Sequence, residues 1–357
     1  MNAITSPVSD RISAPRTMQA AVYRRFGGPD VVCIERRPVP QPARGEVLMR
    51  VRTTTVSAAD HRARAKDLPR GLGLVSAAVL GVFRPRLEVL GMDAAGVVEA
   101  VGPGVSRFAV GDEVVAMLGA RFGGHAEYVT VPESGVIARK PAGMDFEEAV
   151  ALVFGGVTAH AFLRRAGMQA GTRVLVNGAS GAVGTAAVQL AAAAGAHVTA
   201  VTSGGNAAFV RSLGADRVVD YRATDFAAEG RRYDVIVDAV GNAPFARVDG
   251  ILVPRGALLQ VTADLRELLL ARYRSRRSGR MVVADVPFTA ADIDAVVSAG
   301  ESGRLRPIID RTVSLADIVE AHRHVDRGRK RGSVVVRVVS DAADVASTDR
   351  RAEQVRA

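Results

Sequence analysis

The sequence contains one cysteine, no tryptophan and few aromatic residues of any kind. Cys33, alone among 357 residues, excludes an internal disulfide and any structural zinc site built from several thiolates. Aromatic residues make up 4% of the chain but hydrophobic residues 48%, so the core must consist largely of Ala, Val and Leu, as in a parallel sheet covered by helices of small residues. A single thiol also fits a reducing compartment, and we expect a cytoplasmic protein.

The sequence also lacks a long apolar run, so we expect no transmembrane segment. Residues 1–17 contain Pro7, Asp10 and Pro15 without an apolar core, which predicts a flexible tail rather than a secretory signal. The most apolar stretch, residues 71–83 (GLGLVSAAVLGVF), is too short to span a bilayer and is flanked by Arg. We interpret it as a buried or pocket-lining segment, with contact to a membrane surface as the alternative.

Basic residues outnumber acidic ones, with 47 Lys and Arg against 37 Asp and Glu. This balance favours an anionic ligand such as a dinucleotide, although a solvated, Arg-rich surface explains it equally well. Residues 271–280 (ARYRSRRSGR) are the most basic segment, which predicts a loop near a cofactor, a dimer edge or a nucleic-acid patch. Tyr273 is its only aromatic residue for base stacking, so we expect no specific nucleic-acid partner.

The pattern of apolar runs changes once along the chain and then changes back. Short Val-rich strands with Gly and Pro turns are predicted at residues 18–22, 31–36, 46–56, 94–101, 113–117 and 126–131. Helices are predicted at residues 146–152 and 158–166, and six apolar runs then alternate with helical segments from residue 173 to residue 284. The pattern predicts an α/β protein with a β-barrel-type domain (18–145 and 305–340), a doubly wound parallel sheet of six strands (146–304) and a second flexible tail (341–357).

The strongest motif is a glycine-rich turn between a strand and an Ala-rich helix, in RVLVNGASGAVGTAAVQLAAAAGAHVTAVTS. Gly178, Gly181 and Gly184 would allow a sharp turn, a close backbone approach to a pyrophosphate and tight packing of the helix on the sheet. Gly181, Ala182 and Val183 would direct backbone N–H groups at the phosphates. The complete strand–turn–helix–strand context predicts dinucleotide binding.

The end of the second strand of this unit carries no acidic residue, although an NAD site places one there to bind the ribose hydroxyls. Thr202, Ser203 and Asn206 stand there instead, and these neutral groups would not repel a 2′-phosphate. We therefore expect NADPH, with NADH possible. A simple turn with Asn206 capping the next helix explains the same residues, and both interpretations are compatible.

Several motifs in a fixed order resemble the quinone oxidoreductase branch of the medium-chain dehydrogenase/reductase superfamily. They are AVYRRFGGPDV, GMDAAGVVEAVGPGVSRFAVGDEV, GGHAEYVTVP, VNGASGAVGTAAVQLA, RSLGADRVVDY, YDVIVDAVG and GSVVV. The resemblance implies a GroES-like catalytic domain, a Rossmann domain, an active site between them and a homodimer. It further implies that Thr158 lies near the nicotinamide ribose and that Ser203, Asn206 and Tyr221 meet the 2′-phosphate. Asn206 stands where a Lys is common.

The stretches that hold catalytic zinc in the alcohol dehydrogenases of this superfamily read TTVSAADHR and GMDAAG here. Ser57 is close to the Cys position, Met92 occupies the His position, and only Asp93 could ligate. The four-Cys structural lobe is missing as well, so we expect no bound metal. His61 and His125 are isolated, and a structural role or a proton-transfer or substrate contact is open for each.

Without zinc, hydride transfer to an activated acceptor is the chemistry that requires least of the protein. We expect a reductase of a small quinone, enone or similar carbonyl compound, with Val240 and Gly241 beside the nicotinamide or its ribose. Ser57, Asp60 and His61 are the candidate catalytic residues, although Asp60 could equally cap local backbone. The alternatives are an alcohol or aldehyde reductase, an enoyl-thioester reductase and, in another class, a non-catalytic NADPH-binding or nucleic-acid-binding protein.

Overall fold

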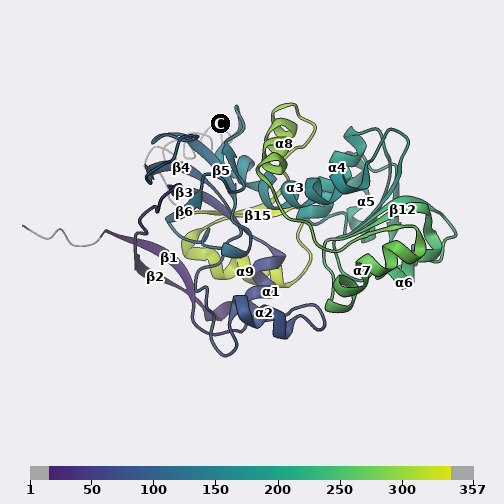
Figure 1. Cartoon of the computed structure of the whole chain (residues 1–357), viewed down its shortest axis with the longest axis horizontal. Helices are drawn as coiled ribbons and strands as arrows, with labels where there is room; N and C mark the ends of the chain where they lie inside the picture. The colour runs from purple at the N-terminus through teal and green to yellow at the C-terminus, as the bar shows by residue number, and fades with distance from the viewer. Residues whose placement is uncertain (1–15, 339–357) are drawn as a thin grey trace, which may run out of the picture.

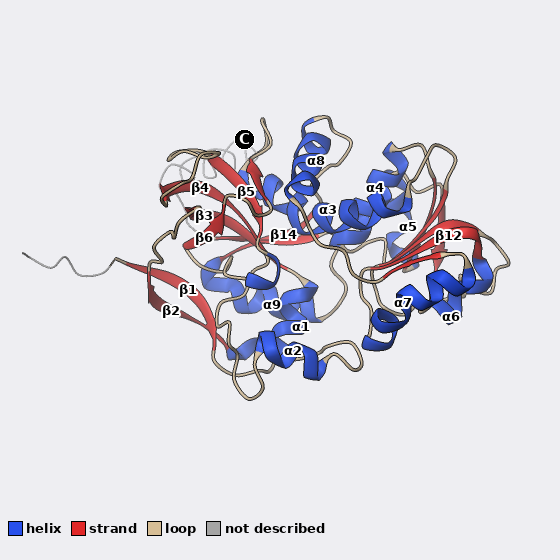
Figure 2. Cartoon of the chain, in the orientation of Figure 1, coloured by secondary structure: helices blue, strands red, loops and turns tan. Residues whose placement is uncertain are grey.

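The computed structural model describes residues 16–338, so most of the two predicted tails lies outside the described residues. The chain forms two lobes with one extended sheet each (Figures 1 and 2). One sheet is entirely parallel, has the strand order β10-β9-β8-β11-β12-β13 and contains the phosphate-binding turn. Its strands are β8 (Arg173–Asn177), β9 (His197–Thr202), β10 (Arg217–Asp220), β11 (Tyr233–Asp238), β12 (Leu252–Gln260) and β13 (Met281–Val283).

This order places the sheet's reversal point between β8 and β11, which pair directly although β9 and β10 lie between them in sequence. Ligands of open α/β sheets bind at the carboxyl ends of the strands at such a point. Helices lie on both faces of the sheet (Figure 2). They are α4 (Ala182–Ala193), α5 (Ala207–Ser212), α6 (Phe245–Val248) and α7 (Leu265–Ser278). The predicted α/β fold with a doubly wound, six-stranded Rossmann sheet is confirmed.

The other lobe contains the GroES-like sheet, in which the last strands of the chain join strands from its first half. The order is β14-β15-β3-β4-β5-β7, with β6 also paired to β3, and β1 with β2 forms a separate hairpin. The strands are β1 (Thr17–Tyr23), β2 (Val32–Pro38), β3 (Glu46–Val56), β4 (Asp93–Val101), β5 (Glu113–Met117), β6 (Tyr128–Pro132), β7 (Ile137–Arg139), β14 (Ile309–Ser314) and β15 (Ser333–Arg337). Helices α1 (Ala58–Ala65), α2 (Gly73–Leu80) and α9 (Ile318–Asp326) accompany them.

One long helix, α3 (Phe146–Ala166), joins the lobes, where the sequence pattern predicted two shorter helices. The glycine pair in its middle does not break it, because both glycines make close contacts. A Cβ on Gly155 would lie 2.4 Å from the carbonyl oxygen of Ala182, and one on Gly156 would lie 3.0 Å from Val296. By length and composition α3 could cross a membrane, but 72% of its apolar window is buried, as expected of a core helix. Helix α8 (Ala290–Glu301) packs on it.

The basic segment at residues 271–280, predicted as a loop, lies largely within helix α7, and the apolar run at residues 71–83 contains helix α2. Helix α7 begins at a side-chain cap, where Asp264 accepts from the N–H of Glu267, and it ends at Gly279 in the left-handed conformation. The density of Arg in 271–280 concealed this helix, because its apolar positions are few. The fold brings α2 and α7 to the same side of the molecule (Figure 1).

Candidate functional site

A cleft of about 1140 Å³ opens between the lobes at the carboxyl edge of the parallel sheet. Ten of the twelve residues predicted to bind the cofactor line it: Gly178, Gly181, Ala182, Val183, Gly184, Thr202, Ser203, Asn206, Tyr221 and Val240. Thr158 and Gly241 do not line it. Thr158 is buried in α3, and Gly241 lies behind Val240, where a Cβ would approach Thr262 to 2.9 Å. The cleft therefore contains most of the predicted cofactor residues.

The glycine turn has the open geometry that a phosphate requires. Gly181 is the N-cap of α4, no side chain caps this helix, and a Cβ on Gly181 would have only the carbonyl of Gly178 within 4 Å. Gly184 differs, since its Cβ would lie 2.1 Å from the same carbonyl, so only glycine lets the helix approach the turn. Gly178 has φ +83°, a backbone conformation that favours glycine. The N–H groups of the first helical turn thus face an unobstructed cleft.

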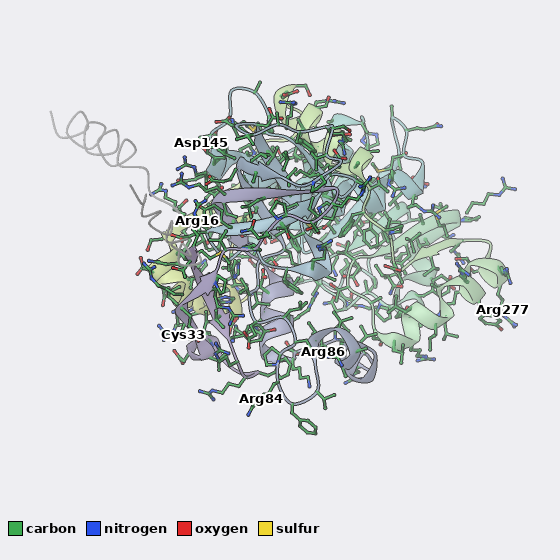
Figure 3. All side chains as sticks on the ribbon, turned by 60° about the vertical axis from the view of Figure 1, so that its left-hand side comes forward. Arg16, Cys33, Arg84, Arg86, Asp145 and Arg277 are labelled. Atoms are coloured by element: carbon green, nitrogen blue, oxygen red, sulfur yellow. The ribbon has the colours of Figure 1, made fainter. Side chains whose placement is uncertain are left out.

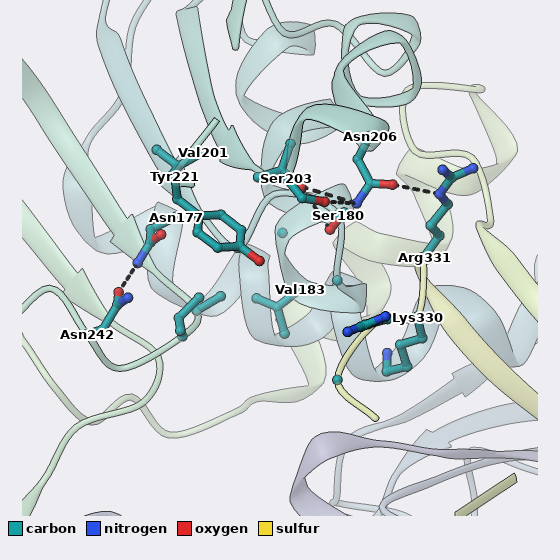
Figure 4. A pocket seen from close by; sticks show the side chains of 18 of the residues that line it. Asn177, Ser180, Val183, Val201, Ser203, Asn206, Tyr221, Asn242, Lys330 and Arg331 are labelled. Atoms are coloured by element: carbon teal, nitrogen blue, oxygen red, sulfur yellow. Dashed lines mark hydrogen bonds between the residues drawn. The ribbon is translucent and has the colours of Figure 1, made fainter. Parts of the chain in front are cut away.

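A buried polar network fixes the loop that follows β11 at the reversal point. Asp238, fully buried, accepts hydrogen bonds from the N–H groups of Val240 (3.1 Å), Gly241 (3.0 Å) and Ala243 (2.8 Å). The side-chain amide of Asn177, at the end of β8, donates to Asp238 at 2.9 Å and to Asn242 at 2.6 Å. This network holds Val240 at the wall of the cleft, and Figure 4 shows its hydrogen bond between Asn177 and Asn242.

The loop after β9 is joined to a segment from the end of the chain. Asn206 donates to the hydroxyls of Thr202 and Ser203, both at 3.3 Å. Its amide oxygen accepts from Nε of Arg331 at 2.7 Å, and Arg331 also donates to the carbonyl of Gly205 at 3.1 Å. Figure 4 shows Arg331 beside Asn206, with Ser203 and Tyr221 nearby on the same wall. The guanidinium of Arg331 therefore supplies a positive charge beside the loop after β9, whose own polar residues are neutral.

The cleft is strongly cationic. Among the described residues that line it, seven carry a positive charge and one, Asp225, a negative charge that is paired with Arg247 at 2.8 Å. The seven are Arg62, Arg222, Arg247, Arg327, Arg329, Lys330 and Arg331. Burial lowers the pKa of Lys330 to about 8, against the opposing effect of the carboxylates of Asp310 and Asp93. Such a wall attracts a polyanion.

These residues fit a dinucleotide by their own geometry. The open turn at Gly181 accepts a group that a Cβ would obstruct, and the seven cations that line the cleft match several phosphates. The hydroxyl of Thr158, buried in α3 and outside the lining of the cleft, has no hydrogen-bond partner in the described structure. The site can therefore hold a dinucleotide cofactor.

The three candidate catalytic residues lie together at the start of α1 but outside the cleft lining, to which their neighbours Ala58 and Arg62 contribute. Ser57 is the N-cap, and its N–H and hydroxyl both donate to Asp60, at 2.7 and 2.6 Å. Asp60 is fully buried and also accepts from the N–H of Gly91 at 2.8 Å. His61 contacts Asp326 at 2.7 Å. The capping alternative for Asp60 matches these contacts, while a role in catalysis is untested.

The two stretches that correspond to the catalytic zinc site of alcohol dehydrogenases contain one residue that could ligate a metal, the buried Asp93. Burial raises the pKa of Asp93 to about 7, partly offset by hydrogen bonds from Thr55, while the charge of Asp60 raises it further. Nε2 of His125 donates to the carbonyl of Thr55 at 2.9 Å, and the His125 ring meets the buried ring of His322 edge-on. Residues 16–338 contain no group of three or more His, Cys, Asp or Glu side chains that could hold a metal ion.

Sequence reasoning missed the cations from the other lobe. Arg327 to Arg331 form the basic run RGRKR directly before the final strand, and Gly332 pairs with Gly181 across the cleft as an isolated bridge. The density of positive charge in this run could have indicated an anion-binding segment. Its position beside the glycine turn could not be predicted, because the two are about 150 residues apart in sequence and only the fold brings them together. Arg62 and Arg222 had no sequence signal beyond their charge.

Comparison with known proteins places the chain among dehydrogenases. Residues 43–142 match the alcohol dehydrogenase GroES-like domain, and residues 213–336 match a family described as zinc-binding dehydrogenase. The chain is 30% identical over 342 residues to a chloroplast envelope quinone oxidoreductase homolog of Arabidopsis thaliana, covering 90% of this chain and 99% of the relative. It is 30% identical over 350 residues to 2-methylene-furan-3-one reductase of Solanum lycopersicum, covering 94% and 82%.

A solved structure agrees with these relatives. The quinone oxidoreductase from Coxiella burnetii superposes with a TM-score of 0.79 at 25% identity, over 91% of this chain and 100% of that one. The matching lobes, the glycine turn and the cleft between them give one conclusion. The chain belongs to the quinone oxidoreductase branch of the medium-chain dehydrogenase/reductase superfamily, a family of NAD(P)H-dependent oxidoreductases.

Proposed function

We propose that this protein is a zinc-independent, NADPH-dependent reductase that transfers hydride to a quinone, an enone or a similar small carbonyl acceptor. The observation that carries the cofactor choice is Arg331, whose guanidinium is held on Asn206 beside Ser203 and Tyr221. Arginine binds phosphate oxygens through two N–H groups at once. The acidic residue that lines the cleft, Asp225, is paired with Arg247 and does not lie at the end of the second strand, where an NAD site places its carboxylate. The names of the relatives support the acceptor class.

Each part of the cleft has a role in this proposal. Gly178, Gly181, Ala182, Val183 and Gly184 form the pyrophosphate turn at the start of α4. Thr202, Ser203, Asn206 and Tyr221 surround the adenosine end, with Arg331 on the 2′-phosphate. Thr158, Val240 and Gly241 form or support the wall beside the nicotinamide and its ribose. Lys330, next to the turn, balances the charge of the pyrophosphate.

The bound nicotinamide would supply the hydride, and the chain would position the acceptor and exclude water. Ala58 and Arg62 line the end of the cleft near Val240, and Arg62 donates to Thr262 of the other lobe at 3.1 Å. This bond holds the lobes together where an acceptor would enter. Protonation of the product needs only water or a hydroxyl, and Ser57, Asp60 and His61 remain the candidates on the protein side. No step requires a metal.

We further propose domain limits of 18–145 with 305–340 for the catalytic domain and 146–304 for the cofactor domain. The crossing of β14 and β15 into the GroES-like sheet supports this division. A homodimer and a cytoplasmic location are the remaining parts of the proposal, and both rest on the family and on cysteine usage rather than on a contact.

The decisive experiment measures loss of the reduced-nicotinamide absorbance with chelator-treated protein, NADPH or NADH, and a panel of quinones, enones, aldehydes and enoyl thioesters. We expect turnover with NADPH that survives chelation and is fastest with a quinone or enone. Faster turnover of aldehydes or thioesters would replace the acceptor class. Tight NADPH binding without turnover of any acceptor would contradict the reductase and favour a cofactor-binding protein.

A further inference from the structure

Two unusual sequence features, the apolar run at residues 71–83 and the basic segment at 271–280, have no part in the cofactor cleft. The fold makes them neighbours. The N–H of Leu265, at the start of α7, donates to the carbonyl of Arg70 just before α2, at 3.0 Å. Gly71 packs so tightly on Leu265 that a Cβ would lie 2.8 Å from that side chain. The segment that leads into α2 therefore contacts the start of α7, so that the two features lie on adjoining parts of the two lobes.

The α2 side exposes apolar side chains at its tip. Phe83 is 91% exposed, and Val82 and Val79 beside it are 55% and 48% exposed. Val79 lies in the last turn of α2, and Val82 and Phe83 follow the helix after the buried Leu80 and Gly81. Contiguous exposed apolar groups mark a contact surface more often than a free one.

The α7 side is a basic helix face. Its solvent-facing positions are Arg266, Leu269, Arg272, Tyr273, Arg276 and Arg277. The only acidic residue of α7, Glu267, is buried and paired with Arg274, so it does not offset the exposed charges. Residues 68–86 contain Arg70, Arg84 and Arg86 and no acidic residue at all. Figure 3 shows Arg84 and Arg277 at the outer edges of the two lobes.

Exposed apolar side chains next to Arg84 and Arg86, with a second basic face on α7, match one kind of partner best. A bilayer with anionic lipids offers hydrocarbon for Phe83 and Val82 and a negative surface for the arginines. A protein partner would need acidic groups placed to match each arginine, and nucleic acid offers little to three aliphatic and aromatic tips. Charge complementarity and apolar exposure together therefore favour a membrane surface.

This surface also lies beside the acceptor end of the cleft. The contact between Arg70 and Leu265 is three residues along the chain from Thr262, which accepts from the cleft-lining Arg62. A bilayer docked on α2 and α7 would thus lie next to the place where an acceptor enters. A lipophilic acceptor dissolved in that bilayer would not need to cross water.

We propose that the surface formed by α2, residues 81–86 and α7 docks on anionic membranes, so that the enzyme reduces a quinone with a long hydrocarbon tail from the bilayer. The choice of acceptor rests on the proposed reductase function, whereas docking does not. Docking is therefore tested first, without cofactor or acceptor.

The test measures co-sedimentation of the full chain with phosphatidylcholine vesicles made with or without phosphatidylglycerol. We expect binding only with phosphatidylglycerol, weakened by salt. Phe83→Ser should reduce partitioning about tenfold. Arg84→Gln combined with Arg272→Gln should reduce it about twentyfold, since each positive charge near an anionic surface contributes roughly a fivefold factor.

Matched controls come from elsewhere on the surface. Val110→Ser removes another exposed apolar side chain (64% exposed), and Arg304→Gln removes an exposed arginine after α8. Both should leave binding unchanged. Equal binding to both kinds of vesicle, or equal losses in test and control variants, would overturn the proposal. So would a shift in oligomeric state by light scattering with no change in vesicle binding, which would assign the surface to a second copy.

Turnover then tests the acceptor. With a long-chain isoprenoid quinone in anionic vesicles, Phe83→Ser should lose about tenfold in rate, but with a water-soluble short-chain quinone it should match the unmodified protein. Absence of turnover with the soluble quinone would contradict the reductase function, not docking. Equal rates of both proteins on the vesicle-borne quinone would contradict membrane delivery.

Discussion

The cofactor cleft and the polar cluster at the start of α1 use charged residues in opposite ways. In the cleft, seven positively charged side chains accompany one carboxylate, which is paired with Arg247. In the cluster, Ser57 and Asp60 are buried and hydrogen-bonded to each other, and Asp60 also accepts from Gly91. Unbalanced charge indicates a ligand, whereas a saturated network indicates architecture. The comparison predicts that mutations in the two regions will differ in kind.

The largest effect is expected from Asp60→Ala. It leaves the buried N–H groups of Ser57 and Gly91 without an acceptor, which should cost about 3 kcal/mol of unfolding free energy. Chemical denaturation measures this, and NADPH affinity of the folded fraction should stay unchanged. A folded, fully stable variant with a collapsed kcat would reverse the assignment and make Asp60 catalytic.

Arg331→Ala should act on the ligand instead of the fold. Removing a charge-assisted phosphate contact costs about 2 kcal/mol, so the Kd for NADPH should rise roughly thirtyfold while that for NADH changes little. Fluorescence titration with both cofactors measures this. Arg304→Gln, at an exposed site outside the cleft, serves as the control. Equal losses for both cofactors would show that Arg331 supports the loop and does not read the 2′-phosphate.

The lowered pKa of Lys330 leads us to expect that cofactor binding depends on pH. Its pKa is about 8 in the free protein, and bound phosphates would favour the charged form and raise that pKa. NADPH affinity should therefore be highest below pH 8 and fall about tenfold as the pH rises beyond it. Titrations across this range measure the slope. Lys330→Arg should abolish the slope, and a slope that survives the substitution would assign it to another group.

The smallest effect is expected where the two regions meet. Thr262→Val removes the acceptor for Arg62 and so one bond between the lobes. A single hydrogen bond of this kind contributes about 1 kcal/mol, so kcat/KM should fall at most fivefold, with unfolding and NADPH binding unchanged. A larger loss would mean that Arg62 contacts the acceptor itself.

The same contrast explains what could be predicted from the sequence. The strand β8, the turn at Gly181 and helix α4 are local in sequence, so their pattern predicted the dinucleotide-binding unit and five lining residues of the cleft. Arg331 contacts Asn206, which is 125 residues away in sequence, and the pattern of charges along the chain could not predict this pairing. The helix α7 was missed because arginine occupies its exposed face, and α3 was predicted as two helices because close packing, invisible in sequence, stabilises its glycine pair.

The bridge between Gly332 and Gly181 has a kinetic consequence. Gly332 donates its N–H to Ser180 in the glycine turn at 2.9 Å, while the next residue begins β15 of the other lobe. The wall that faces the phosphates is thus anchored to both lobes, and a nucleotide entering there tightens the contact that also shapes the acceptor end. We expect a compulsory order of addition, with the nucleotide first and its oxidised form released last.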